Sequence, residues 1–236
     1  YVRQGEFQYC ETDDCIAYYS QNSQENTIVY SSDGDLTQLV SERTKVYNPS
    51  HRLLYEMDDK ILYEHEEIHI QNVKIVKMIC GDRSDNIAGI KNMGIKKFLS
   101  LFPELRERPI TIQEVIDKSN KMFEEDKNNK TVANLLTGVT KYGVFGEEFF
   151  SLNESIVSLD QPFLTDEARE TITALINEEL DPEGRSYKNT MKMMMEDGIF
   201  TVLPKSDDAW IKFLNPFLRL TRKEKNKRVI KFKTNE

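Results

Sequence analysis

The sequence is poor in cysteine, and its cysteines are not arranged for a structural role. Cys10, Cys15 and Cys80 are the only three in 236 residues, and they form no C-x-x-C pair. Such an odd, unpaired set predicts neither a disulfide framework nor a cysteine-based zinc site. We therefore expect a protein of a reducing compartment, the cytoplasm.

Long apolar runs and net positive charge are also lacking. No apolar stretch approaches the roughly 20 residues that cross a bilayer, so we expect no membrane partner. There is no secretory signal pattern, and the chain begins at Tyr1 rather than Met, so we expect a fragment or a processed chain. The net charge of -8 alone argues against a nucleic-acid partner. The segment 219–233 is strongly basic, however, and acidic clusters combined with basic segments are typical of a metal-dependent nuclease.

The first sixty residues have an α/β pattern, and the remainder is mainly helical. Residues 10–23 have helical spacing, whereas 27–31, 45–47 and 53–55 are β-branched or aromatic runs typical of strands. After these runs the β signal nearly stops. From about Ile70 onward the apolar spacing is helical. Further helices are expected near 143–158, 165–179, 186–197 and 207–214.

Carboxylates occur in three clusters at the ends of these expected elements. The clusters are Glu11, Asp13 and Asp14; Asp33 and Asp35; and Asp82 and Asp85. Each has an ordinary structural alternative: capping of a first helical turn, an Asp-Gly hairpin turn, and solvated or capping side chains on one helical face. Brought together at the C-terminal edge of a sheet, however, the carboxylates would repel one another unless they bound cations. Oxygen ligands alone favour Mg²⁺ or Mn²⁺ over zinc.

A glycine-bounded segment follows the third cluster. Its nine residues are Gly89, Ile90, Lys91, Asn92, Met93, Gly94, Ile95, Lys96 and Lys97. It is not a Walker loop, because Ile95 stands where that loop requires lysine. Glycine would let backbone amides approach a phosphate while the lysines supply charge, which predicts DNA binding. The alternative is an ordinary connection with glycine just after a helix.

The order and spacing of these motifs resemble the 5′-nuclease superfamily from residue 10 to about 100, with the phage ribonuclease H members most similar. The matching runs are Glu11-x-Asp13-Asp14, Ser32-Asp33-x-Asp35-Leu36 and Gly81-Asp82-x-Ser84-Asp85-Asn86-Ile87-x-Gly89. The resemblance implies an α/β fold: the C-terminal portion of a PIN-like 5′-nuclease core over residues 1–60, a helix-three-turn-helix region over 61–160 and a helical C-terminal region with a basic tail over 161–236. It also implies that the first strands of the family core, with further aspartates, are not in this chain.

The resemblance further implies the activity and the ligands. It predicts a Mg²⁺-dependent 5′-3′ exonuclease or flap endonuclease with ribonuclease H activity, acting in phage DNA replication in the host cytoplasm. Two Mg²⁺ ions, replaceable by Mn²⁺, would be held by the three carboxylate clusters, and K⁺ would bind at the helix-three-turn-helix. Expected partners are duplex DNA, 5′-flap DNA and RNA·DNA hybrid, with a single-stranded-DNA-binding protein or sliding clamp. We expect a monomer.

Two alternatives come from other classes. If the nuclease core is incomplete, the chain would act as a duplex DNA-binding module without catalysis. The run His65-Glu66-x-x-His69 also matches a zinc metalloprotease pattern, in which a helix presents both histidines. Its surroundings are not clearly helical, and His51 is the only other histidine available as a third ligand.

Overall fold

The chain forms two units in a computed structural model. One unit comprises Gly5–Glu178, and the other comprises Tyr1–Gln4 with Glu179–Glu236. The structure describes residues 5, 7–146, 148–178 and 187–199, with 208, 211, 212 and 215. The helix expected near 207–214 falls mostly outside the described residues, and the basic segment 219–233 falls wholly outside them.

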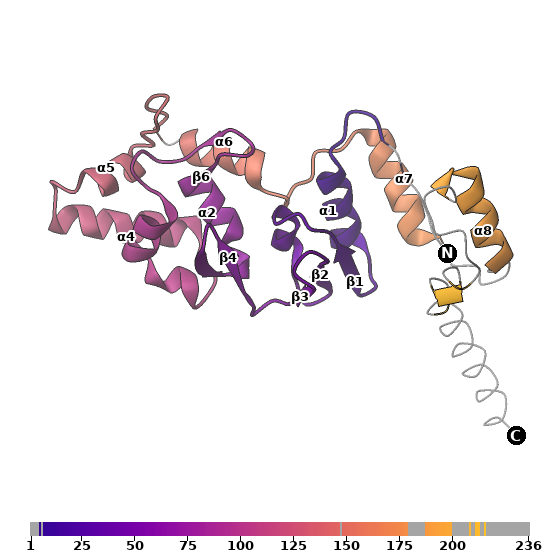
Figure 1. The fold of residues 1–236 in the computed structure, drawn as a ribbon. Helices are drawn as coiled ribbons and strands as arrows, with labels where there is room; N and C mark the ends of the chain where they lie inside the picture. Colours follow the sequence, from indigo (N-terminus) through magenta and orange to yellow (C-terminus); the bar gives the residue numbers. More distant parts are fainter. Residues whose placement is uncertain are drawn as a thin grey trace, which may run out of the picture. The chain divides into compact units, whose positions relative to one another are not determined.

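Helices and strands alternate at the start of the chain, and helices dominate after it (Figure 1). The helices are α1 (Thr12–Asn22), α2 (Val73–Cys80), α3 (Ile95–Leu101), α4 (Ile112–Glu125), α5 (Lys130–Leu136), α6 (Glu148–Val157), α7 (Asp166–Asn177) and α8 (Tyr187–Glu196), with the 3₁₀ helices η1 (Asp35–Leu39), η2 (Ile70–Asn72) and η3 (Pro103–Arg106). The strands are β1 (Thr27–Tyr30), β2 (Thr44–Asn48), β3 (Leu53–Tyr55), β4 (Lys60–Tyr63), β5 (Glu66–His69), β6 (Gly81–Asp82) and β7 (Ile87–Ala88). The α/β expectation is confirmed.

A small sheet organises the first part of the larger unit. β1 pairs in parallel with β2, and β2 pairs antiparallel with β3. Val29 and Val46 point from the sheet into a core that also contains Ala17 of α1 and Leu36 of η1. Because β1 and β2 run parallel, the chain must cross over between them, and η1 lies in that crossover. The Asp-Gly run therefore does not form a hairpin turn.

A two-stranded hairpin, β4–β5, follows where the sequence indicated almost no further strand. Lys60 pairs with His69, and Tyr63 pairs with Glu66. Glu64 and His65 form the turn with positive φ angles of 45° and 72°. The expectation was wrong because these strands are short and apolar Leu62 lies on their exposed side, so the alternation of apolar and polar residues that signals a strand is weak.

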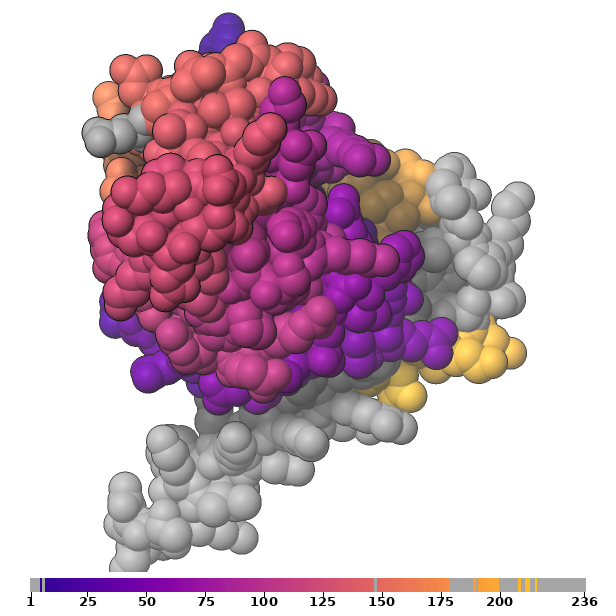
Figure 2. All heavy atoms as spheres, turned by 90° about the vertical axis from the view of Figure 1, so that its left-hand side faces the viewer, coloured from indigo at the N-terminus to yellow at the C-terminus, as the bar shows by residue number. Residues whose placement is uncertain are grey.

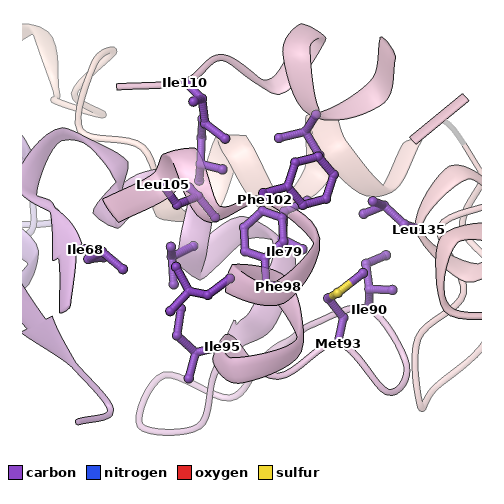
Figure 3. Packing of buried hydrophobic residues seen from close by; sticks show 14 of the residues in the cluster. Ile68, Ile79, Ile90, Met93, Ile95, Phe98, Phe102, Leu105, Ile110 and Leu135 are labelled. Carbon is purple, nitrogen blue, oxygen red and sulfur yellow. The ribbon is translucent and has the colours of Figure 1, made fainter. Parts of the chain in front are cut away.

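The main core of the larger unit is built around two aromatic side chains. Phe98 and Phe102 lie one helical turn apart, with ring centroids separated by 5.1 Å. Figure 3 shows them surrounded by apolar residues from α2, the following turn and α5, among them Ile79, Ile90 and Leu135. Full burial of such side chains stabilises a fold by roughly 1.5–3 kcal/mol each. This core fixes α2 and α3, the two helices that flank the carboxylates and the glycine turn.

A buried amide ties α6 to the same region. Asn153 Nδ2 donates to the carbonyl oxygen of Met78 in α2 at 2.8 Å and to that of Ala88 in β7 at 2.9 Å. Asn153 is only 5% exposed. One side chain therefore satisfies two buried carbonyl groups and holds β7 against the end of α2.

We expect Asn153→Ala to lower the free energy of unfolding by about 2 kcal/mol, because an unsatisfied buried polar group costs roughly 1–3 kcal/mol. Urea unfolding followed by circular dichroism measures the change. Ser155→Ala is the matched control, since the Ser155 hydroxyl bonds only the exposed carbonyl of Leu152 in the same helix, and a change within about 0.5 kcal/mol is expected there. Equal destabilisation by the two variants would contradict the assigned role of Asn153.

Candidate functional site

Three aspartates from two distant parts of the sequence converge in the larger unit. Asp35, Asp82 and Asp85 each offer a carboxylate oxygen, and these oxygens lie within 4.8 Å of one another. Asp35 and Asp82 are half-buried, and Asp85 is exposed. We refer to these three side chains as the acidic triad.

Local backbone bonds position Asp35. The Ser31 hydroxyl oxygen accepts from the backbone N–H of Asp33 at 3.1 Å, and a carboxylate oxygen of Asp33 accepts from the N–H of Asp35 at 2.9 Å. These bonds turn the chain from β1 into η1, and η1 is anchored by buried Leu36 and Leu39. Asp35 is the first residue of η1, so its position follows from the end of β1.

Asp82 and Asp85 lie on a turn, not on a helix. α2 ends at Cys80 because Gly81 adopts a left-handed φ of 79°, after which Asp82 pairs with Ile87 across β6–β7. A carboxylate oxygen of Asp82 accepts from the Ser84 N–H at 2.8 Å. The expectation that Asp82 and Asp85 share one helical face was wrong, because Gly81 ends the helix first.

A lysine lies among the three carboxylates. Lys77 Nζ forms an ion pair with Asp35, lies 2.5 Å from Asp82 Oδ2 and 3.9 Å from Asp85 Oδ2. Its side chain is only 9% exposed. Sequence reasoning did not find this residue. The available signal was a lysine inside the apolar run Val73–Cys80.

The surroundings shift the pKa values of the cluster in opposite directions. Burial raises the pKa of Asp35, an effect that outweighs the bond from Lys77. Burial also acts to raise the pKa of Asp82, but the hydrogen bonds from Lys77 and Ser84 bring it down to about 2. Burial acts to lower the pKa of Lys77, and its bonds to Asp35 and Asp82 raise it. At neutral pH Asp82 and Lys77 therefore form a charged pair.

The other four predicted ligands lie near the start of α1 and in the loop after β1. Glu11 is the residue before α1, but its side chain forms no capping hydrogen bond, whereas Asp13 and Asp14 lie in the first turn. Burial raises the pKa of Asp13, and so do the charges of Asp33, Asp35, Glu11 and Asp14. The charges of Glu11, Asp14 and Asp33 thus act on Asp13, but among the described residues these four carboxylates are not part of the acidic triad.

The predicted DNA-binding turn runs directly from β7 into α3. Ile90, Met93 and Ile95 are buried in the core, whereas Lys91, Asn92, Lys96 and Lys97 are exposed. Asn92 has a φ of 64°, and Gly94 is the residue before α3, with its carbonyl accepting from Phe98 N–H. The alternation places apolar side chains inward and all three lysines toward solvent.

Gly89 allows the turn to approach α2 closely. A Cβ added at Gly89 would lie 2.1 Å from the carbonyl oxygen of Cys80 and 2.6 Å from the N–H nitrogen of Gly81. Backbone atoms cannot move aside as a flexible side chain can. Glycine at this position therefore serves the packing of β7 against the end of α2, while the residue with left-handed φ at the end of that helix is Gly81.

The β4–β5 hairpin also contacts the site. The Tyr63 hydroxyl donates to the carbonyl oxygen of Gly81 at 3.4 Å, next to Asp82. Burial and the charge of Asp82 raise the pKa of Tyr63, so this hydroxyl remains protonated and able to donate. Sequence reasoning missed Tyr63 because it missed the hairpin that carries it.

The histidines of the protease pattern lie on this same hairpin. His65 is in its turn, and Glu66 and His69 are in β5. His69 is buried, and its Nδ1 accepts from the N–H of Gln71. The metalloprotease alternative required a helix presenting both histidines and is wrong, since the pattern spans a turn and a strand.

Among the helices in the described residues, none is both long and apolar enough to cross a membrane.

Comparisons with known proteins give partial matches. No protein-family model matches the chain. DNA polymerase I of Borreliella burgdorferi is 33% identical over 99 residues, which are 41% of this chain and 11% of that protein. The 5′-3′ exonuclease of Aquifex aeolicus is 32% identical over 99 residues, 39% of this chain and 32% of the relative. That of Mycoplasma pneumoniae is 32% identical over 100 residues, 40% and 34% respectively. The matches thus span at most 34% of these relatives.

Solved structures of T5 5′-exonuclease share the fold. A structure with bound divalent metal ions (zinc) has a TM-score of 0.52 at 21% identity, covering 72% of this chain and 60% of that one. A T5 flap endonuclease variant in a pseudo-enzyme-product complex with DNA and metal ions has a TM-score of 0.53 at 21% identity, with the same coverage. The resemblance to the 5′-nuclease superfamily is therefore confirmed: this chain is similar in sequence to 5′-3′ exonucleases over about 100 residues and similar in fold to T5 5′-exonuclease.

Proposed function

We propose that this chain carries the metal-binding and DNA-binding parts of a 5′-nuclease. The enzyme would be a Mg²⁺-dependent 5′-3′ exonuclease or flap endonuclease with ribonuclease H activity. The observation that carries the proposal is the convergence of Asp35, Asp82 and Asp85 from separate elements. Their position beside a lysine-bearing turn supports it. The role would be removal of RNA primers or 5′ flaps in phage DNA replication.

The donor set of the site suits hard divalent cations. The acidic triad offers carboxylate oxygens and no sulfur or imidazole, which favours Mg²⁺ or Mn²⁺ over zinc. Two such cations supply activation of a water molecule and stabilisation of the leaving oxygen in phosphodiester hydrolysis. The pKa of Asp82, lowered to about 2, keeps its carboxylate ionised at neutral pH, as metal binding requires.

Roles for the seven carboxylates follow from their two locations. In this proposal the group around α1 and β1 serves one ion, and the end of α2 serves the second. The first group is Glu11, Asp13, Asp14, Asp33 and Asp35, and the second is Asp82 and Asp85. Lys77 neutralises part of the negative charge when no cation is bound, because its ammonium contacts both groups through Asp35 and Asp82.

The turn Gly89–Lys97 would contact a phosphate of duplex DNA. Its exposed Lys91, Lys96 and Lys97 supply charge, and the start of α3 presents backbone N–H groups. We also propose that K⁺ binds at this turn. The proposed division of the chain is a metal-binding core over 1–60, a DNA-binding region over 61–160 and a C-terminal region over 161–236.

Substrates and partners of the whole protein are proposed from the resemblance to the 5′-nuclease superfamily. They are duplex DNA, 5′-flap DNA and RNA·DNA hybrid, with a single-stranded-DNA-binding protein or sliding clamp as protein partner and the host cytoplasm as location. We propose that the protein acts as a monomer.

The proposal is tested with a 5′-flap duplex labelled at either end. The full chain is incubated with it in Mg²⁺, in Mn²⁺ and in chelator, and products are resolved by length. Metal-dependent release of short 5′ fragments is the expected result. Binding in a gel shift without any cleavage would favour the DNA-binding module. Neither binding nor cleavage would overturn both readings.

A further inference from the structure

The loop between α5 and α6 forms a further hairpin, residues 137–146. Val139 pairs with Val144, and Thr140 N–H donates to the carbonyl of Gly143 at 2.8 Å. Gly138, with a φ of 59°, closes the base, where Phe145 N–H donates to its carbonyl at 3.0 Å. We call this segment the 137–146 hairpin. Its backbone bonds give it a defined shape.

Backbone pairing joins the 137–146 hairpin to the glycine turn. Ile90 forms a β-bridge with Thr140, and Lys91 N–H donates to the carbonyl of Val139 at 2.8 Å. Asn134 Nδ2 donates to the carbonyl of Lys91 at 3.3 Å. Two segments about 50 residues apart in sequence therefore form one continuous surface. In Figure 2 the salmon segments that follow α5 adjoin magenta segments of the same unit.

The two paired segments contain no acidic residue, although Asp85 of the acidic triad directly precedes the first of them. Residues 86–97 and 137–146 contain four lysines and no aspartate or glutamate, although the whole chain has 40 acidic residues in 236. The lysines are Lys91, Lys96, Lys97 and Lys141. In a chain with a net charge of -8, this segregation makes the surface electrostatically complementary to a polyanion.

The tip of the 137–146 hairpin presents an aromatic ring that packing does not require. Tyr142 is 60% exposed, and Lys141 Nζ lies 4.6 Å from its ring centroid. The Tyr142 hydroxyl lies 3.4 Å from Asn86 Oδ1, and Asn86 directly follows Asp85 of the acidic triad. The ring is thus held by one end at the border between the glycine turn and the triad.

We propose that the 137–146 hairpin is a second nucleic-acid contact, in which Tyr142 stacks on an unpaired base and Lys141 binds a phosphate. The proposal rests on the proposed nuclease function and adds a substrate preference to it. Stacking on an exposed aromatic side chain is available to an unpaired base, whereas a base in the interior of a duplex already stacks on a neighbour on each side. The hairpin therefore favours a strand with a single-stranded flap over a fully paired duplex.

The test is fluorescence anisotropy with the full chain in chelator, so that binding is measured without cleavage. Two labelled ligands are compared, a blunt duplex and the same duplex with a single-stranded 5′ flap. Tyr142→Ala is expected to weaken flap binding about tenfold, since one base–aromatic stack is worth roughly 1–3 kcal/mol. The affinity of this variant for the blunt duplex is expected to stay within about twofold of that of the unaltered chain. Tyr142→Phe keeps the ring and retains flap affinity.

The charge part of the proposal is measured by salt dependence. Lys141→Ala is expected to reduce the slope of log affinity against log salt for the flap ligand by about 0.7–0.9, the contribution of one phosphate contact. Tyr30→Ala is the matched control, because Tyr30 is 72% exposed on β1, away from the hairpin in sequence and pairing. It leaves both affinities unchanged.

The outcomes separate this proposal from the nuclease function. If Lys96→Ala weakens binding of both ligands while Tyr142→Ala and Lys141→Ala change neither, the hairpin proposal is overturned and the DNA-binding turn remains. The same result would follow if the exposed Val144 and Phe145 served a protein partner instead. If the unaltered chain binds neither ligand, the hairpin proposal and the DNA-binding role fail together.

Discussion

Asp35→Asn is expected to lower Mg²⁺-dependent cleavage by at least about a hundredfold while leaving duplex DNA binding nearly unchanged. Substituting a residue that merely supports a metal ligand already costs roughly 10–100-fold in metal affinity or activity, and Asp35 would be a ligand itself. Its oxygen is one of the three that converge. The turn Gly89–Lys97, which we propose to bind DNA, lies on separate elements and does not depend on this carboxylate.

The measurements are a cleavage assay, a gel shift in chelator, and Mn²⁺ binding followed by calorimetry. Mn²⁺ binding is included because it reports on the site even if this chain cleaves slowly. Asp117→Asn is the control, since Asp117 lies on α4 and its side chain accepts from Gln113 of the same helix. Equal loss of DNA binding and cleavage in the Asp35 variant would refute the separation of the two roles.

The sequence predicts the positions of Asp35 and Asp82 for different reasons. Asp35 follows the β-branched run 27–31, which was correctly predicted to be a strand and is β1. Asp82 follows an apolar helix that the spacing of Ile75, Val76 and Ile79 also indicates. The sequence pattern does not reveal the left-handed φ of Gly81. Because of this φ the helix ends, so Asp82 lies in β6 and Asp85 lies in the loop between β6 and β7.

Lys77 could not be assigned from local pattern because its role depends on tertiary neighbours. In sequence it is a lysine on an apolar helix, and such a residue normally extends its ammonium to solvent. Its partners Asp35 and Asp82 come from opposite ends of a long stretch of chain, and only the packing of η1 against α2 brings them together. The contact of Tyr63 with Gly81 could not be predicted for the same reason, since it requires the β4–β5 hairpin.

Lys77→Met is expected to lower the free energy of unfolding in chelator by about 3 kcal/mol, because removing one partner from a buried ion pair leaves uncompensated charge. Methionine keeps the apolar length of the side chain within α2, so the loss reports mainly on the ammonium. Asp35 and Asp82 would then face each other, with Asp85, without a neutralising cation. Thermal and urea unfolding in chelator measure the change.

Added Mg²⁺ or Mn²⁺ should restore much of the stability lost in the Lys77→Met variant. A cation that binds only the folded state adds about 2.7 kcal/mol at a hundred times its dissociation constant, and without the competing ammonium that constant should fall. The metal-induced rise in Tm is therefore expected to be larger in Lys77→Met than in the unaltered chain.

Lys74→Met is the matched control. Lys74 lies on the same helix, but it pairs with the more exposed Glu154 and Asp160. Its loss is therefore expected to cost about 1 kcal/mol or less and to leave the response to metal unchanged. An identical rise in Tm for the Lys77→Met variant and the unaltered chain would mean that ammonium and metal do not share the acidic triad, and the metal site would have to be sought among the carboxylates near α1.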